Sequence, residues 1–146
     1  MPERDPVSAV ALYGSQARGN PDERSDVDIL VVTRERRTRH VMMGNISFYH
    51  YPWSNLVRKA RAGDLFVCHI VKESRSLYDR AGRFGPLGNA FRLKTSYNRE
   101  IRDASDLGWY IAHHYDRIAE PVVAKRIAWC VRTILIARSA EEKNPL

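Results

Sequence analysis

The sequence of 146 residues predicts an α/β fold of the α+β type, in which helices flank a small sheet and a helical hairpin ends the chain. Two short apolar segments near the start, residues 7–13 and 27–33, suit buried strands. Segments after residue 52 show helical spacing and helix-end residues instead. A chain of this length is expected to form one compact unit, with a core at residues 1–84 and a helical extension at 89–146.

The first predicted strand ends at a glycine turn. Its apolar residues run from Val7 to Tyr13 and are bounded by Pro6 and Gly14. Because glycine tolerates a positive φ, Gly14 lets the chain approach a ligand closely, and Ser15 is a good cap for a short helix after it. Such a helix start presents unpaired backbone N–H groups, so this turn is a candidate site for a phosphate.

Two aspartates mark the start of the second predicted strand. Asp26 and Asp28 are separated by one residue, so in a strand their side chains point to the same face. Two carboxylates side by side repel each other unless a cation lies between them. Oxygen ligands favour Mg²⁺, which keeps water molecules and binds substrate phosphates. The simpler alternative is a pair of surface carboxylates at a Ser-Asp turn and a glycine that only ends a strand.

The combination of these two features carries a family resemblance. Gly14-Ser15, followed after ten residues by Asp26-Val27-Asp28, resembles the Gly-Ser-x10-Asp-x-Asp signature of the DNA polymerase β nucleotidyltransferase superfamily, and in particular its minimal nucleotidyltransferase (MNT) branch. The resemblance implies a nucleotidyltransferase-fold sheet that moves a nucleoside monophosphate, usually from ATP, to a hydroxyl group. Similarity to the antitoxins of MNT/HEPN pairs implies a HEPN-type toxin as the protein partner.

The same resemblance implies roles for individual residues. Asp26 and Asp28 would be catalytic and would hold two Mg²⁺ ions, with ATP as substrate. A metal pair about 4 Å apart stabilises both the attacking and the leaving oxygen in such a transfer. The nucleotide-binding residues that it implies are Gly14, Ser15, Arg18 and Ser25.

One departure from the family pattern concerns a third carboxylate on the next strand. The segment from Ile46 to Tyr51 is the predicted strand and contains no acid. The apolar alternation places Ser47 where the acid is expected and His50 on the opposite face. Acids further along could fold back to the site, although each also suits a helix cap or a surface charge; they are Asp64, Glu73 and Asp79.

Two functions of different classes follow from this departure. The favoured one is an active, Mg²⁺-dependent transferase that acts on a protein. The second is a catalytically impaired module that binds nucleotide or a partner. A small-molecule transferase of the aminoglycoside type is disfavoured, because little chain remains to enclose a drug.

The middle of the chain is predicted to be mainly helical. Residues 53–62 have Pro52 before them and Gly63 after them, as helix ends prefer. Asp64 then caps a helix over 65–72, in which His69 is interpreted as a packed or capping residue. Residues 77–79 are predicted to be a short closing strand, and the glycine-rich segment 82–88 a linker.

The last third of the chain predicts two antiparallel helices. In the first, Ile101, Ala104, Gly108, Ile111, Tyr115 and Ile118 form one apolar stripe. In the second, which Pro121 begins, the shared face is Val123, Ile127, Val131, Ile134 and Arg138. His113 and His114 are interpreted as packing residues of the first helix. This hairpin is expected to pack on the sheet, bind a partner or form a homo-oligomer. The resemblance implies a helix before the first strand, but only about six residues precede that strand here, which favours the last two options.

Charge and cysteine content give weaker indications of binding partners and of the cellular compartment. The net charge is +7, and the densest basic run, Arg34–His40, is interpreted as a solvated hairpin loop, with binding of a nucleic acid or another polyanion kept as the alternative. Cys68 and Cys130 lie in apolar helical segments and are predicted to be buried free thiols. No run approaches the length of a membrane span, so a cytoplasmic protein is expected.

Overall fold

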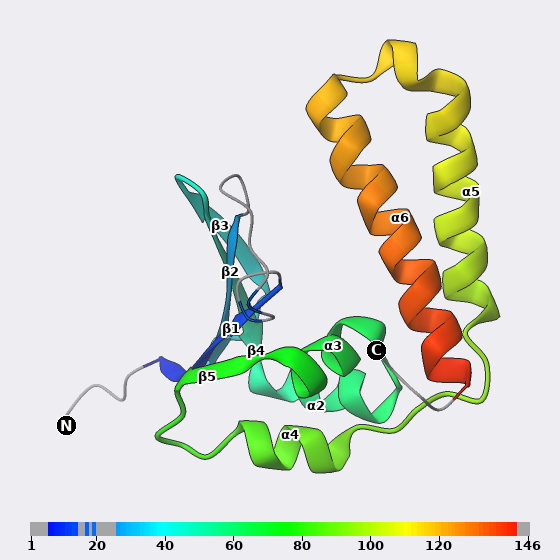
Figure 1. The fold of residues 1–146 in the computed structure, drawn as a ribbon. Coiled ribbons are helices and arrows are strands. Elements are labelled where there is room, and N and C mark those ends of the chain that lie inside the picture. Colours follow the sequence, from blue (N-terminus) through cyan, green and yellow to red (C-terminus); the bar gives the residue numbers. More distant parts are fainter. Residues whose placement is uncertain (1–5, 15–16, 18, 20–25, 143–146) are drawn as a thin grey trace. The chain divides into compact units, whose positions relative to one another are not determined.

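The computed structural model describes residues 6–14, 17, 19 and 26–142. The chain forms two compact units, Met1–Arg92 and Leu93–Leu146 (Figure 1). The first unit contains a mixed five-stranded sheet with helices beside it, and the second contains the helical hairpin. The predicted α+β fold class is therefore confirmed.

The sheet has the order β3-β4-β2-β1-β5. Its strands are β1 (Val7–Tyr13), β2 (Val27–Thr33), β3 (Arg39–Met43), β4 (Ile46–Pro52) and β5 (Arg75–Tyr78). The central strand β2 pairs antiparallel with β1 and parallel with β4, while β3 and β5 are the antiparallel edge strands. The first two strands have the predicted bounds, because apolar segments of seven residues between breaks suit the centre of a sheet.

Strand β3 was not predicted, and the interpretation of Arg34–His40 as a loop is wrong for its last two residues. Arg39 and His40 begin β3, which pairs with β4 through a tight turn at Gly44 and Asn45. Gly44 has a φ of 60°, which this kind of turn requires. The Gly-Asn pair was the available hairpin signal, but the neighbouring arginines favoured a loop.

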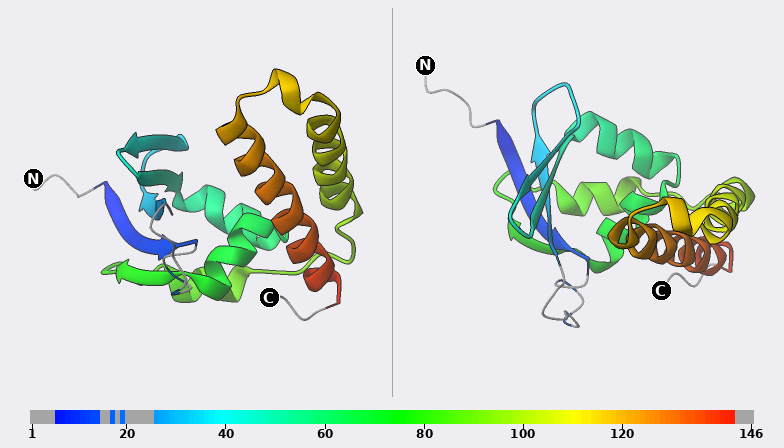
Figure 2. Two further views of the ribbon diagram at one scale, coloured as in Figure 1. Left: turned by 45° about the horizontal axis from the view of Figure 1, so that its top comes forward. Right: turned by 90° about the horizontal axis from the view of Figure 1, so that it is seen from above.

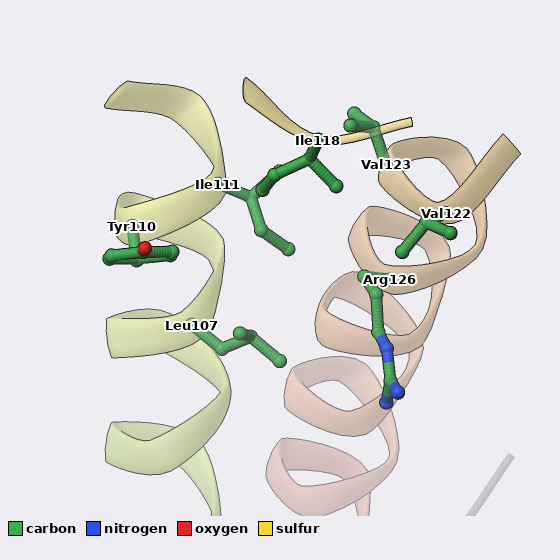
Figure 3. A pocket seen from close by; sticks show the side chains of 7 residues that line it. All are labelled: Leu107, Tyr110, Ile111, Ile118, Val122, Val123 and Arg126. Atoms are coloured by element: carbon green, nitrogen blue, oxygen red, sulfur yellow. The ribbon is translucent and has the colours of Figure 1, made fainter. Parts of the chain in front are cut away.

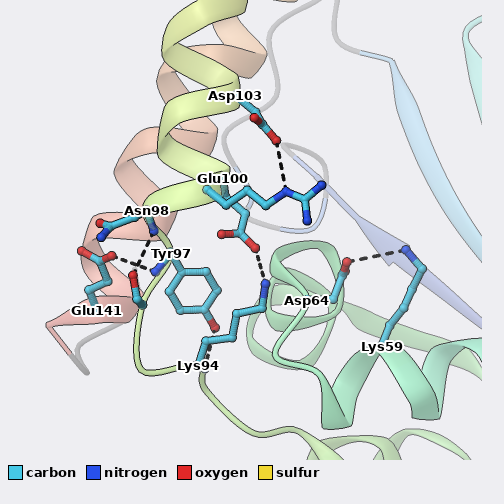
Figure 4. Close-up of polar contacts among 10 residues, drawn as sticks. Lys59, Asp64, Lys94, Tyr97, Asn98, Glu100, Asp103 and Glu141 are labelled. Atoms are coloured by element: carbon cyan, nitrogen blue, oxygen red, sulfur yellow. Dashed lines mark hydrogen bonds and ion pairs between the residues drawn. The ribbon is translucent and has the colours of Figure 1, made fainter.

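Helices α2 (Trp53–Arg61) and α3 (Leu65–Glu73) confirm the two helices predicted after the sheet. Between them, Gly63 has a φ of 73°. The Asp64 carboxylate caps α3 by accepting a hydrogen bond of 3.1 Å from the backbone N–H of Val67. The same carboxylate lies 3.5 Å from Lys59 Nζ (Figure 4). Local cap chemistry therefore determined this part of the fold.

The linker predicted at residues 82–88 is wrong, because Phe84–Ala90 forms helix α4. The Asp79 carboxylate accepts hydrogen bonds from the backbone N–H groups of Arg83, at 2.6 Å, and Phe84, at 3.1 Å. Leu87 is fully buried. A side-chain cap and one buried leucine thus outweigh the poor helix propensity of glycine in this segment.

The core of the first unit lies between one face of the sheet and these helices (Figure 2). Strand residues at alternating positions supply one side of the core, and α2, α3 and α4 supply the other. Its fully buried members include Ala9, Leu30, Val32, Leu56, Ala60, Val67, Ile70 and Leu87. Alternation along the strands therefore fixes which face of β1 and β2 meets the helices.

The second unit is the predicted antiparallel hairpin of α5 (Asn98–His114) and α6 (Glu120–Glu141), joined by the short helix η1 (Tyr115–Arg117). The two long helices approach closely at Gly108, where an added Cβ would lie 3.7 Å from Cys130 Cβ. At the open end of the hairpin, the backbone N–H of Tyr97 donates a hydrogen bond of 2.8 Å to Glu141 (Figure 4). These contacts hold the two helices side by side.

The face predicted for α6 is partly wrong. Val131 and Ile127 are exposed, whereas Cys130 and Ala137 are buried. Tyr115, which was placed on the stripe of the first helix, is also exposed. The reason is that apolar residues surround α6 on all sides, so spacing alone does not choose the face that packs on α5.

Two smaller sequence predictions concern the cysteines and the membrane. Cys68 and Cys130 are both buried free thiols, as predicted. Burial raises the pKa of the Cys68 thiol, which keeps it protonated and unreactive. Among the helices of the described ranges, none has both the length and the apolar character needed to cross a bilayer.

Candidate functional site

The end of β1 and the start of β2 meet at Gly14 and Asp28. Tyr13 is paired with Asp28 across the two strands, so the following residue, Gly14, lies directly beside the aspartate. Gly14 has a φ of 75°, and a Cβ placed on it would lie 2.5 Å from Asp28 Oδ2. No side chain fits there without displacing the carboxylate. The predicted glycine turn and one of the two predicted acids are therefore in contact.

The other predicted acid, Asp26, is the residue immediately before β2 and is partly buried. Next to it, the backbone N–H of Val27 donates a hydrogen bond of 2.8 Å to the carbonyl of Asn45, which ties the start of β2 to the β3–β4 turn. In the described part of the chain, no group of three or more His, Cys, Asp or Glu side chains is arranged for a metal ion. The Asp28 carboxylate lies beside the space that Gly14 leaves open, and carboxylate oxygens are ligands that suit Mg²⁺, which takes its remaining ligands from water and phosphate.

Three residues assigned to nucleotide binding lie outside the described residues. They are Ser15, Arg18 and Ser25. Their roles stay predictions.

Ser47 lies beside Asp28 in the parallel pairing of β2 with β4. Residues in register on neighbouring strands point to the same face. Ser47 therefore occupies the position at which the family pattern predicted an acid. The pairing is regular along β4, which places His50 on the opposite face, as predicted. Burial lowers the pKa of His50, and the positive charge of Arg39 lowers it further, against a smaller opposing effect of Glu35.

The three downstream acids that could have replaced the missing carboxylate have structural partners instead. Asp64 and Asp79 cap α3 and α4, as described above. Glu73 lies 3.2 Å from Nδ1 of His69, one turn earlier in α3. The ordinary roles that the sequence allowed for these acids are the ones found.

His40 is a polar residue of this region that the sequence interpretation missed. Its Nε2 lies 2.6 Å from Ser47 Oγ in a hydrogen bond, and its ring stacks on that of Tyr49 with centroids 4.1 Å apart. Both contacts cross from β3 to β4. The pairing of these strands brings His40 to Ser47. Because the sequence predicted a loop at His40, this contact could not be predicted.

Aromatic side chains line the sheet next to these polar residues. The ring of Phe66 from α3 lies 5.6 Å from that of Tyr13 and 5.2 Å from that of Tyr51, between centroids. Burial raises the pKa of Tyr51, and the negative charge of Asp64 contributes in the same direction. The tyrosine therefore stays neutral and packs as an apolar residue with a polar end.

The histidines of the hairpin contact aromatic side chains of the same helix, His113 by stacking and His114 with its ring tilted. The His113 ring lies 3.9 Å from the Trp109 ring, and the His114 ring lies 4.5 Å from the Tyr110 ring. Trp109 and Tyr110 are exposed. The predicted packing role therefore takes the form of ring contacts along α5.

A largely apolar cavity of about 310 Å³ lies between α5 and α6 near the closed end of the hairpin (Figure 3). Its lining residues are Leu107, Tyr110, Ile111, Ile118, Val122, Val123 and Arg126. It contains no acid and one cation, so it lacks the groups needed for metal-assisted phosphate chemistry.

Comparison with known proteins identifies the family to which the first part of the chain is similar. Residues 1–85 match the family of the nucleotidyltransferase domain. A stretch of 35 residues is 49% identical to a Methanocaldococcus jannaschii protein that is provisionally assigned as a protein adenylyltransferase, and it covers 24% of this chain and 35% of that protein. A nucleotidyltransferase-like protein from Exiguobacterium sibiricum 255-15 has a solved structure that is similar at 18% identity and a TM-score of 0.41, over 94% of this chain and 52% of that one.

The chain thus spans about a third of the curated relative and about half of the solved structure. The family match, by contrast, covers more than half of the chain and includes Gly14, Asp26 and Asp28. The chain belongs to the nucleotidyltransferase domain family.

Proposed function

We propose that this chain transfers AMP from ATP to a hydroxyl group of a protein partner in a Mg²⁺-dependent reaction. The observation that supports this most strongly is the contact between Gly14 and Asp28, because it joins the glycine turn to one acid of the pair. Asp26 and Asp28 would hold Mg²⁺, which supplies positive charge where negative charge develops on the attacking and leaving oxygens. The triphosphate would be held by Gly14, Ser15, Arg18 and Ser25.

A protein acceptor is proposed on two grounds. The M. jannaschii relative is provisionally assigned as a protein adenylyltransferase. The hairpin also exposes large apolar side chains, which suit a protein surface. The partner in this proposal is a HEPN-type toxin that the modification neutralises, so the chain acts as its antitoxin. A second copy of the chain is the other candidate for the same surface.

The test is transfer of label from α-labelled ATP in the presence of Mg²⁺, with and without the protein encoded by the neighbouring gene. We expect label on that protein, and none when Asp26→Asn and Asp28→Asn are combined. Asp106→Asn is the matched control, because Asp106 is an exposed acid in α5. Transfer that survives the double substitution contradicts the proposed site.

A second candidate function is a module that binds Mg-nucleotide without turnover. The observation that favours it is that Ser47, and not an acid, lies in register with Asp28. Binding of a fluorescent ATP analogue together with no label transfer supports this candidate. In either case Ser47→Asp is expected to raise Mg²⁺ affinity, because it adds a carboxylate beside Asp28. Unchanged Mg²⁺ dependence contradicts the placement of the metal at this strand.

A further inference from the structure

The hydrogen bond between Ser47 and His40 lies at the position where a third carboxylate is absent. Ser47 is 4% exposed and its Oγ lies 2.6 Å from His40 Nε2, while His40 itself is exposed. The stacking of the His40 ring on Tyr49, at 10° between planes, fixes the orientation of the imidazole. A hydroxyl bonded to an oriented imidazole is a pair that can pass a proton.

The position of this pair relative to Asp28 gives it a role. Parallel pairing sets Ser47 beside Asp28 on the same face, roughly 5 Å away between backbones. Asp28 in turn touches the position of Gly14. The hydroxyl of Ser47 is therefore a neighbour of the place where the transfer is proposed to occur, and the imidazole lies behind the hydroxyl.

We propose that Ser47 and His40 take the place of the missing carboxylate and remove the proton of the acceptor hydroxyl; this inference rests on the proposed transferase function. The acceptor oxygen forms a bond to the α-phosphorus as the bond to pyrophosphate breaks, and the electron pair of that bond leaves with pyrophosphate. The acceptor proton passes to Ser47 Oγ while the Ser47 proton passes to His40 Nε2. Exposed His40 then releases it to solvent.

The other histidines do not suit this role. His50 lies on the opposite face of β4, and His69 is paired with Glu73 on α3. His113 and His114 belong to the hairpin unit, where their rings contact its aromatic side chains. In this scheme Ser47 touches the substrate and His40 is a positioning residue that acts through it.

The first experiment measures transfer and nucleotide affinity separately in the full chain. With α-labelled ATP, Mg²⁺ and the neighbouring gene's protein, Ser47→Ala and His40→Gln are each expected to lower kcat by about a hundredfold. Affinity for a fluorescent ATP analogue is expected to change by no more than about twofold, because neither residue holds the nucleotide. Ser47→Thr, which keeps the hydroxyl, and His114→Gln, the matched histidine control, are expected to retain activity within about fivefold.

Two further measurements distinguish proton transfer from a structural role. Added imidazole is expected to raise the activity of His40→Ala by about tenfold, because a free base replaces the missing one, and to leave Ser47→Ala unchanged. In NMR spectra of protein labelled at its histidines, addition of Mg²⁺ and a non-hydrolysable ATP analogue is expected to shift the ring signals of His40. The ring signals of His114 are expected to stay in place. Circular dichroism of each variant checks that it folds.

The outcomes separate this inference from the proposed function. Transfer by His40→Gln at the rate of the unmodified chain overturns the role of the pair and leaves the proposed transferase intact. Absence of transfer by the unmodified chain, with His40 signals that do not move, overturns both. A lowered kcat, imidazole rescue and a shifted His40 signal together support the pair.

Discussion

The sheet unit, Met1–Arg92, buries Leu30, Leu56 and Leu87 completely, whereas the hairpin unit, Leu93–Leu146, leaves many of its large apolar side chains exposed. In the sheet unit, the exposed apolar residues lie mainly on the edge strands β3 and β5. In the hairpin they lie along both helices; the most exposed are Trp109, Tyr110, Tyr115, Val131 and Leu135.

This difference follows from the number of faces that each architecture can cover. A sheet with three helices on one face encloses a core by itself. Two antiparallel helices share a single seam, so a helix such as α6 that is apolar all round buries only one of its sides. The comparison shows that the sheet unit encloses its apolar side chains by itself, whereas the hairpin leaves much of its apolar surface exposed.

The largest expected effect is the difference between a buried and an exposed leucine. Leu30→Ala in β2 is expected to lower the free energy of unfolding by about 3 kcal/mol, because it leaves a cavity under the helices. Leu135→Ala in α6 is the matched change in the hairpin, where the side chain is 54% exposed, and is expected to cost less than about 0.5 kcal/mol. Urea unfolding measures both. Equal losses contradict the contrast between the units.

A second substitution tests the site proposed in the sheet unit. Gly14→Ala is expected to destabilise the protein by about 1–2 kcal/mol through its positive φ, and to weaken ATP-analogue binding by about tenfold because its Cβ displaces Asp28. Gly85→Ala in α4 is the control, since nothing lies within 4 Å of a Cβ there. Thermal unfolding and analogue titration provide the readouts. A Gly14→Ala protein that binds like the control separates the glycine turn from the nucleotide.

Helix capping gives a smaller effect in the same direction. Asp64→Ala is expected to cost about 1 kcal/mol, because the backbone N–H of Val67 loses its acceptor at the start of α3. Asp103→Ala, in the hairpin, removes a carboxylate that is 4.0 Å from Arg99 on an exposed surface, and is expected to cost less than about 0.5 kcal/mol. The midpoints of denaturant-induced unfolding of the two variants, at an unchanged slope of the transition, measure the two losses of stability. A larger loss for Asp103→Ala reverses the expected order.

The smallest expected effect is a dependence on pH in the hairpin unit. Burial acts to raise the pKa of Glu100, but the hydrogen bond and ion pair with Lys94, a backbone hydrogen bond and the positive charge of Arg99 together outweigh it and lower the pKa from 4.5 (Figure 4). A lowered pKa adds stability above the unfolded value, and that stability is lost as pH falls through the folded value. Glu100→Gln is therefore expected to cost under about 1 kcal/mol at pH 7 and nothing in strong acid. Unfolding of the unmodified chain and of Glu100→Gln, at pH 7 and in strong acid, measures this difference. A loss of stability that persists in acid would show that the effect comes from packing and not from charge.

Much of the fold and part of the site were determined locally, by short segments of sequence. The spacing of apolar residues fixed β1 and β2, and Asp64 with Gly63 fixed the boundary between α2 and α3. The Gly14 turn and the Asp26–Asp28 pair could also be recognised in the sequence, because the conformational freedom of glycine and the charge of aspartate belong to the residues themselves. Each of these features depends on neighbours close in the chain.

Other features were decided only when distant segments paired. Helix α4 depends on the burial of Leu87 in the core, and the packing face of α6 depends on where α5 lies. The juxtaposition of His40, Ser47 and Asp28 requires three strands in register. The sequence alone determined where the glycine turn and the acidic side chains stand along the chain, whereas tertiary structure decided which of them are neighbours, because strand register and helix burial are set by the whole core and not by any one segment.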